Sequence, residues 1–421
     1  MSEGSAQRRI ATLDIVRGIA VMGILAMNIV AFAMPFQAYM NPLAFGHEGP
    51  ADLAAWAFNF VLIDGKMRGL FSFLFGASML LVIERAEANG ASPARVHYAR
   101  MAWLLVFGLL HFTFIWFGDI LSGYAMIGMI AFLFRRMETR ALIRWGAILV
   151  LVQFLLFAAM AGGAWFLQSQ AAQPGAPADV VAEWQGLHAE LGVPSSEALA
   201  QKLALFTGPY SQYLAHQFGD IAEPFVSLLM FGWETLAYFL FGMAALKSGF
   251  LRGEWADGEY RKAALIGFGI GIPVYALLAW ILLSGGFEVP LLIAASMAAT
   301  VPFRPLMVVA IAAAIILLTR RGGALVDRIA AAGRAAFTNY LGTSILMTGL
   351  FYGWGLGQYG SLSRAELWLV VLAMWVLMLL WSKPWLDRFQ FGPFEWLWRS
   401  LARWQPQPMR RGPPAPRPES A

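Results

Sequence analysis

The chain has 421 residues, of which 59% are hydrophobic and only 13% are charged. Soluble domains carry about 25% charged residues, so this composition excludes a soluble enzyme and a disordered protein and predicts a polytopic membrane protein. The absence of cysteine excludes structural disulfides, thiolate zinc sites, iron–sulfur clusters and a cysteine nucleophile. The net charge of +5 would suggest a nucleic-acid partner in a soluble chain, but here the basic residues follow membrane topology, and we expect no nucleic acid.

Ten apolar stretches are long enough to cross a hydrocarbon core, which takes roughly 20 helical residues. They cover residues 15–34, 67–84, 101–118, 120–134, 145–168, 224–246, 263–284, 291–318, 335–352 and 365–382. Every second connection is rich in arginine and lysine, whereas 170–222 is acidic, with Lys202 as its single lysine or arginine. The positive-inside rule therefore predicts an all-α protein of about ten spans in the lipid bilayer of a bacterial inner membrane, with both termini cytoplasmic and 170–222 outside.

The first stretch has a second interpretation, because an arginine pair, an apolar run and Ala31-Phe32-Ala33 are typical of a cleavable signal peptide. Asp14, Arg17 and Asn28 interrupt the run and favour a retained span.

Four regions follow from this pattern. They are an N-terminal membrane region over 1–168, an outer loop over 169–223, a C-terminal membrane region over 224–404 and a proline-rich disordered tail over 405–421. Within the outer loop, Ser195 or Ser196 is expected to cap a short helix over 197–206. The loop is either a lid on the outer surface or a plain connector.

The segment from Gly355 to Gly360 matches the pattern G-x-G-x-x-G. A dinucleotide site needs this pattern between a strand and a helix, whereas here it follows a membrane span on the outer side. We interpret it as a turn. No metal-ligand spacing occurs elsewhere, and no metal is expected.

Several polar residues lie in apolar stretches, where an ionisable side chain costs at least about 2.5–3.5 kcal/mol at mid-helix. In the first span, Asp14 and Arg17 are three residues apart on one helical face, as an interfacial pair or as part of a site. Asn28 follows eleven residues after Arg17, about 16 Å further along a helix. It lies in the outer half of the membrane, as a helix–helix contact or as a site residue.

The outer segment 35–66 carries His47, Asp52 and an apolar stretch over 53–63 that is too short to span, which predicts a re-entrant or interfacial helix. Directly after it come Asp64, Lys66 and Arg68, placed at the outer interface against the positive-inside trend. The two bases either pair with Asp64 or bind an anion.

Deeper polar groups complete the set. His111 lies in the outer half of the third span, with Asp119 at its end. Glu234 lies in the sixth span, and Arg304 stands between two prolines in the eighth stretch, which predicts a broken helix there. Because unpaired charges at this depth are costly, we expect Glu234 and Arg304 to face each other or a wet cavity. Together these residues predict a cavity open to the outer side, either a transporter vestibule or an active site.

The opening from Arg9 to Ala20, R-I-x-x-L-D-x-x-R-G-I-A, resembles the start of the transmembrane acyltransferase superfamily, which includes the acyltransferase-3 proteins and the heparan-glucosaminide N-acetyltransferases. Residues 333–341 (G-R-A-A-F-T-N-Y-L), Phe351-Tyr352-Gly353 and residues 391–399 (F-G-P-F-E-W-L-W-R) resemble the bacterial family called domain of unknown function 418 (DUF418), the YeiB-like membrane proteins. The resemblance covers nearly the whole chain and is weakest over 145–230.

The superfamily resemblance implies an enzyme that takes an acyl (acetyl) group from cytoplasmic acyl-CoA and delivers it to an envelope sugar or small acceptor outside. Acyltransferase-3 proteins carry their essential histidine where this chain has Asn28, so that mechanism does not carry over. The glucosaminide acetyltransferases have asparagine there and a catalytic histidine in the next outer loop, before an Asp-Leu pair. His47, followed by Asp52-Leu53, occupies the similar place.

The roles implied by this resemblance are His47 as general base, Asn28 as hydrogen-bond donor to the thioester carbonyl oxygen and Arg17 as a ligand of the CoA phosphates. A transporter of a small polar or anionic solute, using Glu234 and Arg304, and a non-catalytic membrane scaffold stay open as alternatives. The sequence shows no twofold internal repeat that would favour transport. A homo-oligomer is compatible with it.

Overall fold

The computed structural model describes residues 11–47 and 49–411, and over these ranges the chain is helical, with no strand beyond one isolated bridge. The N-terminal half contains α1 (Ala11–Ala33), α2 (Gln37–Met40), η1 (Pro42–Ala44), α3 (Pro50–Phe58), η2 (Asn59–Ile63), α4 (Lys66–Ala88), α5 (Pro93–Phe114), α6 (Leu121–Ala131), η3 (Phe132–Phe134), α7 (Thr139–Ala171), α8 (Ala178–Leu191), α9 (Ser196–Thr207) and α10 (Tyr210–Gly219). The second half contains α11 (Glu223–Lys247), η4 (Phe250–Arg252), α12 (Asp257–Ser284), α13 (Val289–Leu292), η5 (Ile293–Ala298), α14 (Arg304–Thr319), α15 (Ala324–Arg334), α16 (Ala336–Phe351), α17 (Leu367–Arg388) and α18 (Pro393–Arg403).

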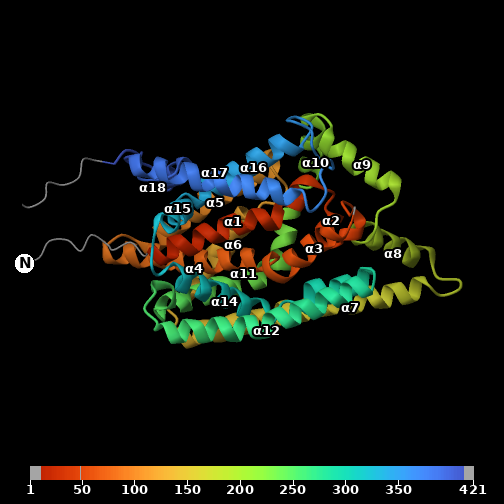
Figure 1. The fold of residues 1–421 in the computed structure, drawn as a ribbon, viewed down its shortest axis with the longest axis horizontal. Coiled ribbons are helices and arrows are strands. Elements are labelled where there is room, and N and C mark those ends of the chain that lie inside the picture. Colours follow the sequence, from red (N-terminus) through yellow and green to blue (C-terminus); the bar gives the residue numbers. More distant parts are fainter. Residues whose placement is uncertain (1–10, 48, 412–421) are drawn as a thin grey trace, which may run out of the picture.

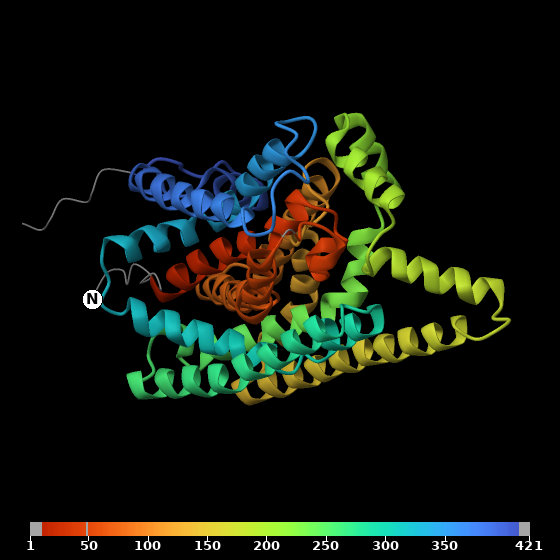
Figure 2. The same ribbon diagram turned by 45° about the vertical axis from the view of Figure 1, so that its right-hand side comes forward.

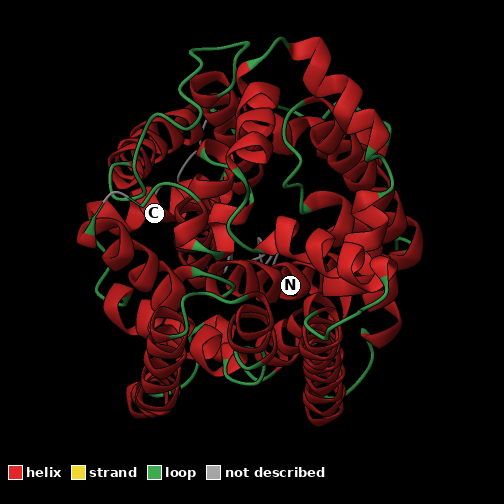
Figure 3. Ribbon diagram, turned by 90° about the vertical axis from the view of Figure 1, so that its right-hand side faces the viewer, coloured by secondary structure: helices red, strands yellow, loops and turns green. Residues whose placement is uncertain are grey.

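The long helices run roughly along one axis and form a bundle around α1 (Figure 1). Figure 3 looks along this axis and shows many of the helices end-on. In α1, 78% of the most apolar window is buried, because α4, α15, α16 and α17 all pack against it. Glycines permit the closest of these crossings: a Cβ atom on Gly333 of α15 would lie 1.8 Å from the carbonyl oxygen of Asp14 in α1.

In the part of the chain that the structure describes, six helices are long and apolar enough to cross a membrane, which confirms a polytopic membrane protein. They are Ala11–Ala33, Pro50–Ala88, Thr139–Ala171, Glu223–Lys247, Asp257–Ser284 and Leu367–Arg388, and shorter apolar helices cover Leu121–Phe134, Val289–Ala298 and Arg304–Thr319. The segment Pro50–Ala88 contains both the expected outer helix near 53–63 and α4, which are joined through Asp64 and Gly65. Ten spans and their orientation stay predictions.

The eighth apolar stretch is a broken helix, as the prolines predict. The π-helix η5 ends at Ala298, residues 299–303 form turns, and α14 begins at Arg304. Proline lacks the backbone N–H needed inside a helix, so the break falls where Pro302 and Pro305 stand. It places the charged Arg304 at the start of a helix deep in the bundle, where its whole residue is only 8% exposed.

The segment between α7 and α11 folds into α8, α9 and α10 at one end of the bundle, while the start of α1 and α18 lie at the other end (Figures 1 and 2). Ser195 caps α9 by accepting a hydrogen bond from the backbone N–H of Ala198, which confirms the predicted cap. This segment packs on the bundle, since Tyr213 is fully buried with its ring 4.8 Å from that of Trp354. It therefore covers one end of the molecule.

Candidate functional site

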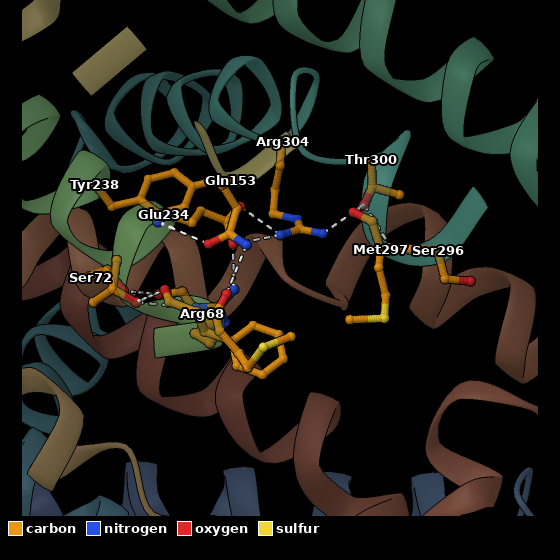
Figure 4. A network of polar contacts seen from close by, with 12 residues as sticks. Arg68, Ser72, Gln153, Glu234, Tyr238, Ser296, Met297, Thr300 and Arg304 are labelled. Carbon is orange, nitrogen blue, oxygen red and sulfur yellow. Dashed lines mark hydrogen bonds and ion pairs between the residues drawn. The ribbon is translucent and has the colours of Figure 1, made fainter. Parts of the chain in front are cut away.

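Most of the polar residues singled out in the sequence fall into two buried groups, and a few lie outside them. The first centres on Glu234 of α11, whose side chain is fully buried and receives two arginines (Figure 4). Nη1 of Arg304 lies 2.6 Å from Oε1 and 2.7 Å from Oε2, and Nη2 of Arg68 lies 2.6 Å from Oε2. The expected meeting of Glu234 and Arg304 is thus present, and Arg68 is a second partner that sequence spacing did not reveal.

The groups around this carboxylate complete its hydrogen bonds (Figure 4). The hydroxyl of Tyr238 donates to Oε1 at 3.4 Å, and Nη2 of Arg304 donates to Oγ1 of Thr300 at 2.7 Å. Gln153 of α7 accepts from the backbone N–H of Glu234 and donates to the carbonyl of Met230. The network joins α4, α7, α11 and the break before α14, and a buried network of this kind fixes the packing of the elements that it connects. Within the described residues, Nε of Arg304 is the buried donor of this network that has no partner.

Of the two alternatives expected for Lys66 and Arg68, pairing with Asp64 or binding an anion, the structure bears on the first. Lys66 is fully buried, its ammonium group donates to the carbonyl of Phe60, and its Nζ lies 3.3 Å from the centroid of the Tyr275 ring. Asp64 is near enough to Lys66 and Arg304 to interact with them electrostatically. Within 11–47 and 49–411, however, no ion pair joins Asp64 to Lys66 or Arg68, because Arg68 pairs with Glu234 instead.

The second group surrounds Asn28 in α1, which is 7% exposed. Its side chain faces a cavity of about 10 Å³, the room that one water molecule needs. The cavity is lined by Val21, Ile24, Leu25, Asn28, Phe32, Trp116, Tyr340, Thr343 and Ser344. Asn28 therefore lines a small, partly open space between α1, α16 and the segment that follows α5.

His111 of α5 lies directly beside this cavity. Its Nδ1 is 2.9 Å from Oδ1 of Asp119, and both side chains are only 1% exposed. The ring centroid of His111 lies 5.2 Å from that of Tyr340 and 6.3 Å from that of Trp116, and both of these aromatic residues line the cavity. Asn28 and His111 thus share two aromatic neighbours, Trp116 and Tyr340. The aromatic residues were not expected from the sequence.

Asp119 is itself held by the backbone. It accepts hydrogen bonds from the N–H groups of Leu121 at 3.1 Å and Ser122 at 2.8 Å, at the first turn of α6. An acceptor at a helix N-terminus satisfies N–H groups that the helix leaves unpaired. The carboxylate of Asp119 is therefore fixed in position before it binds His111.

Asp14 and Arg17 lie at the other end of α1. Nη1 of Arg17 is 3.1 Å from Oδ1 of Asp14, so the predicted pair on one helical face is present. Nη2 of Arg17 also donates to Oγ of Ser78 in α4 at 2.6 Å. The Arg17 side chain is 23% exposed, which leaves part of it available to a ligand.

His47 is exposed in the loop between η1 and α3. Its neighbour Gly46 lies against Met34, just past the end of α1. Asn28 is six residues before Met34, about 9 Å deeper along the helix axis. No side chain in the described part of the chain hydrogen-bonds the His47 ring, and His47 is not among the residues that line the Asn28 cavity.

Comparisons with known proteins agree on one family. The profile of the family described as "Protein of unknown function (DUF418)" matches residues 245–405. The chain is 33% identical over 425 residues to the uncharacterised protein YxaH of Bacillus subtilis, covering 94% of this chain and 96% of that protein. It is 30% identical over 400 residues to the uncharacterised protein YeiB of Escherichia coli, covering 93% and 96%.

Proposed function

This chain belongs to the DUF418 family, and from that premise we propose that it is a membrane-bound acyltransferase. In this proposal acyl-CoA is the co-substrate on the cytoplasmic side, and an envelope sugar or small molecule on the outer side is the acceptor. The protein would lie in the inner membrane with both termini cytoplasmic.

The observation that carries the proposal is the small, partly open cavity at Asn28. An amide that faces a small space within an apolar and aromatic wall is placed to donate a hydrogen bond to one oxygen atom. In acyl transfer, negative charge develops on the thioester carbonyl oxygen, and a fixed donor in a dry site stabilises that charge strongly. In this proposal Asn28 supplies that donor.

The position of Arg17 supports the same assignment. Arg17 and Asn28 lie on one helix, about 16 Å apart along its axis. A guanidinium near one end of α1 would bind the CoA phosphates while the acyl end reaches the cavity at the other. In the proposed orientation, Arg17 lies toward the cytoplasmic side and Asn28 toward the outer side, as acyl transfer across a membrane requires.

The test uses purified protein in detergent or nanodiscs with acetyl-CoA, and it measures release of the CoA thiol with water or glucosamine as acceptor. The chain contains no cysteine, so a thiol-reactive dye reports only CoA. Asn28→Ala should lower kcat by about 10²–10³, the usual effect of removing one oxyanion donor, without loss of CoA binding. Arg17→Ala should mainly raise the KM for acetyl-CoA, because it removes a ligand of the CoA phosphates. A folded wild-type protein that neither binds nor turns over acetyl-CoA would refute the proposal.

A second candidate function is transport of a small anionic solute, favoured by the break at residues 299–303. Discontinuous helices near the middle of a membrane protein are typical of transporter binding sites, and here the break presents Arg304 beside Arg68 and Lys66. Uptake of a labelled anion by proteoliposomes that is lost in Lys66→Met, with no turnover of acetyl-CoA, would favour transport.

A further inference from the structure

We infer that His111 is the general base of the acyl transfer, with Asp119 as its positioning residue, although the family resemblance implies His47 for this role. The inference rests on the proposed function and names the residue that removes the acceptor's proton.

The hydrogen bond to Asp119 decides which nitrogen of His111 is available. A carboxylate accepts, so Nδ1 carries the proton that is donated to Oδ1 at 2.9 Å. In the neutral ring, Nε2 then holds the lone pair that can take a proton. Because the backbone N–H groups of Leu121 and Ser122 fix Asp119, the imidazole is fixed in both orientation and tautomer.

Nε2 of His111, the second ring nitrogen, is buried and has no hydrogen-bond partner in the part of the chain that the structure describes. Leaving a buried polar atom unpaired is unfavourable, so a substrate group that hydrogen-bonds Nε2 would be stabilised there. The Asn28 cavity, which shares Tyr340 and Trp116 with His111, has room for one small polar group.

A second histidine on the same helix shows what a structural role looks like. His97 of α5 is also 1% exposed, but its Nε2 lies 2.9 Å from the carbonyl oxygen of Gly128, so this nitrogen is satisfied by the fold. His111 differs from His97 in being held by a carboxylate and in having a buried ring nitrogen, Nε2, without a partner among the described residues. His47, in contrast, is exposed and lacks a positioning group among the described residues.

The chemistry balances with acyl-CoA and an acceptor hydroxyl or amine. Nε2 of His111 takes the acceptor's proton as the acceptor oxygen or nitrogen forms a bond to the thioester carbonyl carbon. Asn28 donates to the carbonyl oxygen while charge develops on it. The carbon–sulfur bond then breaks, and the imidazolium returns the proton to the CoA sulfur, which leaves as the free thiol.

The experiment compares His111→Ala, Asp119→Asn and the matched control His97→Ala in the acetyl-CoA assay. We expect His111→Ala to lower kcat by about 10²–10⁴, the usual contribution of a general base, with little change in the KM for acetyl-CoA. Added imidazole should restore part of the activity, because the substitution leaves a space of the size of imidazole.

Asp119→Asn should also lower kcat with an unchanged KM. Both carboxylate oxygens of Asp119 accept hydrogen bonds, and the amide group of asparagine has only one oxygen that can accept. His97→Ala should affect thermal stability more than kcat, and imidazole should not change its kcat.

The outcomes separate this inference from the proposed function. An inactive wild type that is folded refutes acyl transfer itself. An active wild type whose folded His111→Ala variant retains full kcat refutes only the role of His111. Loss of kcat in His47→Ala, with His111→Ala active, would return the role to His47. Should His111→Ala fail to fold, His111→Gln keeps a polar side chain of similar size, and full kcat in that variant would equally overturn the inference.

Discussion

Removing the Glu234 carboxylate should destabilise the protein more than removing either of its arginines. Glu234→Gln keeps the shape of the side chain but leaves two guanidinium groups without their anion, 2.6 Å from the altered group in both cases. Breaking a buried pair by removing one partner costs about 3–5 kcal/mol, and the Glu234 side chain is 0% exposed. We expect a loss in this range.

The two arginine variants should be milder. Arg304→Gln leaves Glu234 paired with Arg68, so the carboxylate keeps one cation. Arg68→Gln should lower the stability least, because the Arg68 side chain is 18% exposed. In this variant the Glu234 carboxylate stays paired with Arg304, whose side chain is only 9% exposed. The double variant Glu234→Gln with Arg304→Gln should be more stable than Glu234→Gln alone, with a coupling of about 0.5–3 kcal/mol.

Thermal unfolding in detergent, followed by the fluorescence of the 17 tryptophans, gives the order of stability. Glu223→Gln is the matched control, since it removes an exposed carboxylate from the same helix and should change stability by no more than about 0.5 kcal/mol. Unfolding of Glu234→Gln at the wild-type temperature would refute a stabilising role of the Glu234 carboxylate. Direct coupling between Glu234 and Arg304 would be refuted if the double variant lost as much stability as the two single variants together, or if Arg304→Gln lowered stability as much as Glu234→Gln.

Two further predictions concern topology and helix packing. Single cysteines at exposed positions should react with an impermeant reagent from outside at Gln173 and Gln358, and only after permeabilisation at Asn89, Arg140 and Arg321; outside labelling at Arg140 would contradict the orientation. Gly333→Ala should lower thermal stability by about 1–3 kcal/mol, because the added Cβ would lie 1.8 Å from a backbone oxygen of α1. Gly163→Ala, where a Cβ meets no atom within 4 Å, should keep or raise stability, and equal losses in both variants would show that the α1–α15 crossing is not tight.

Local sequence signals predicted the features that depend on neighbouring residues. Proline at 302 and 305 predicted the broken helix, Ser195 predicted the α9 cap, and the spacing of Asp14 and Arg17 predicted their pair. Each of these depends on backbone chemistry or helical periodicity within a few residues. The pairing of Glu234 with Arg304 was predicted from the free-energy cost of burying an unpaired charge, since two buried side chains of opposite charge are stabilised by each other.

Features that depend on packing between distant segments were not readable. Arg68 stands two residues after Lys66, yet one pairs with Glu234 and the other meets a backbone carbonyl and an aromatic ring. Helix rotation about its axis sends these side chains in different directions, and sequence alone does not fix that rotation. The contact between Tyr340 and His111 joins residues more than 200 positions apart in the sequence. The one sequence signal for this site was that His111 and Asp119 lie near the same end of one predicted span.

Acyl transfer is tested by CoA release from acetyl-CoA with purified wild-type protein, Asn28→Ala and His111→Ala, each shown to be folded. We expect turnover by the wild type, with kcat lower by about 10²-fold or more in both variants. Wild-type protein that releases no CoA and binds no acetyl-CoA would contradict acyl transfer.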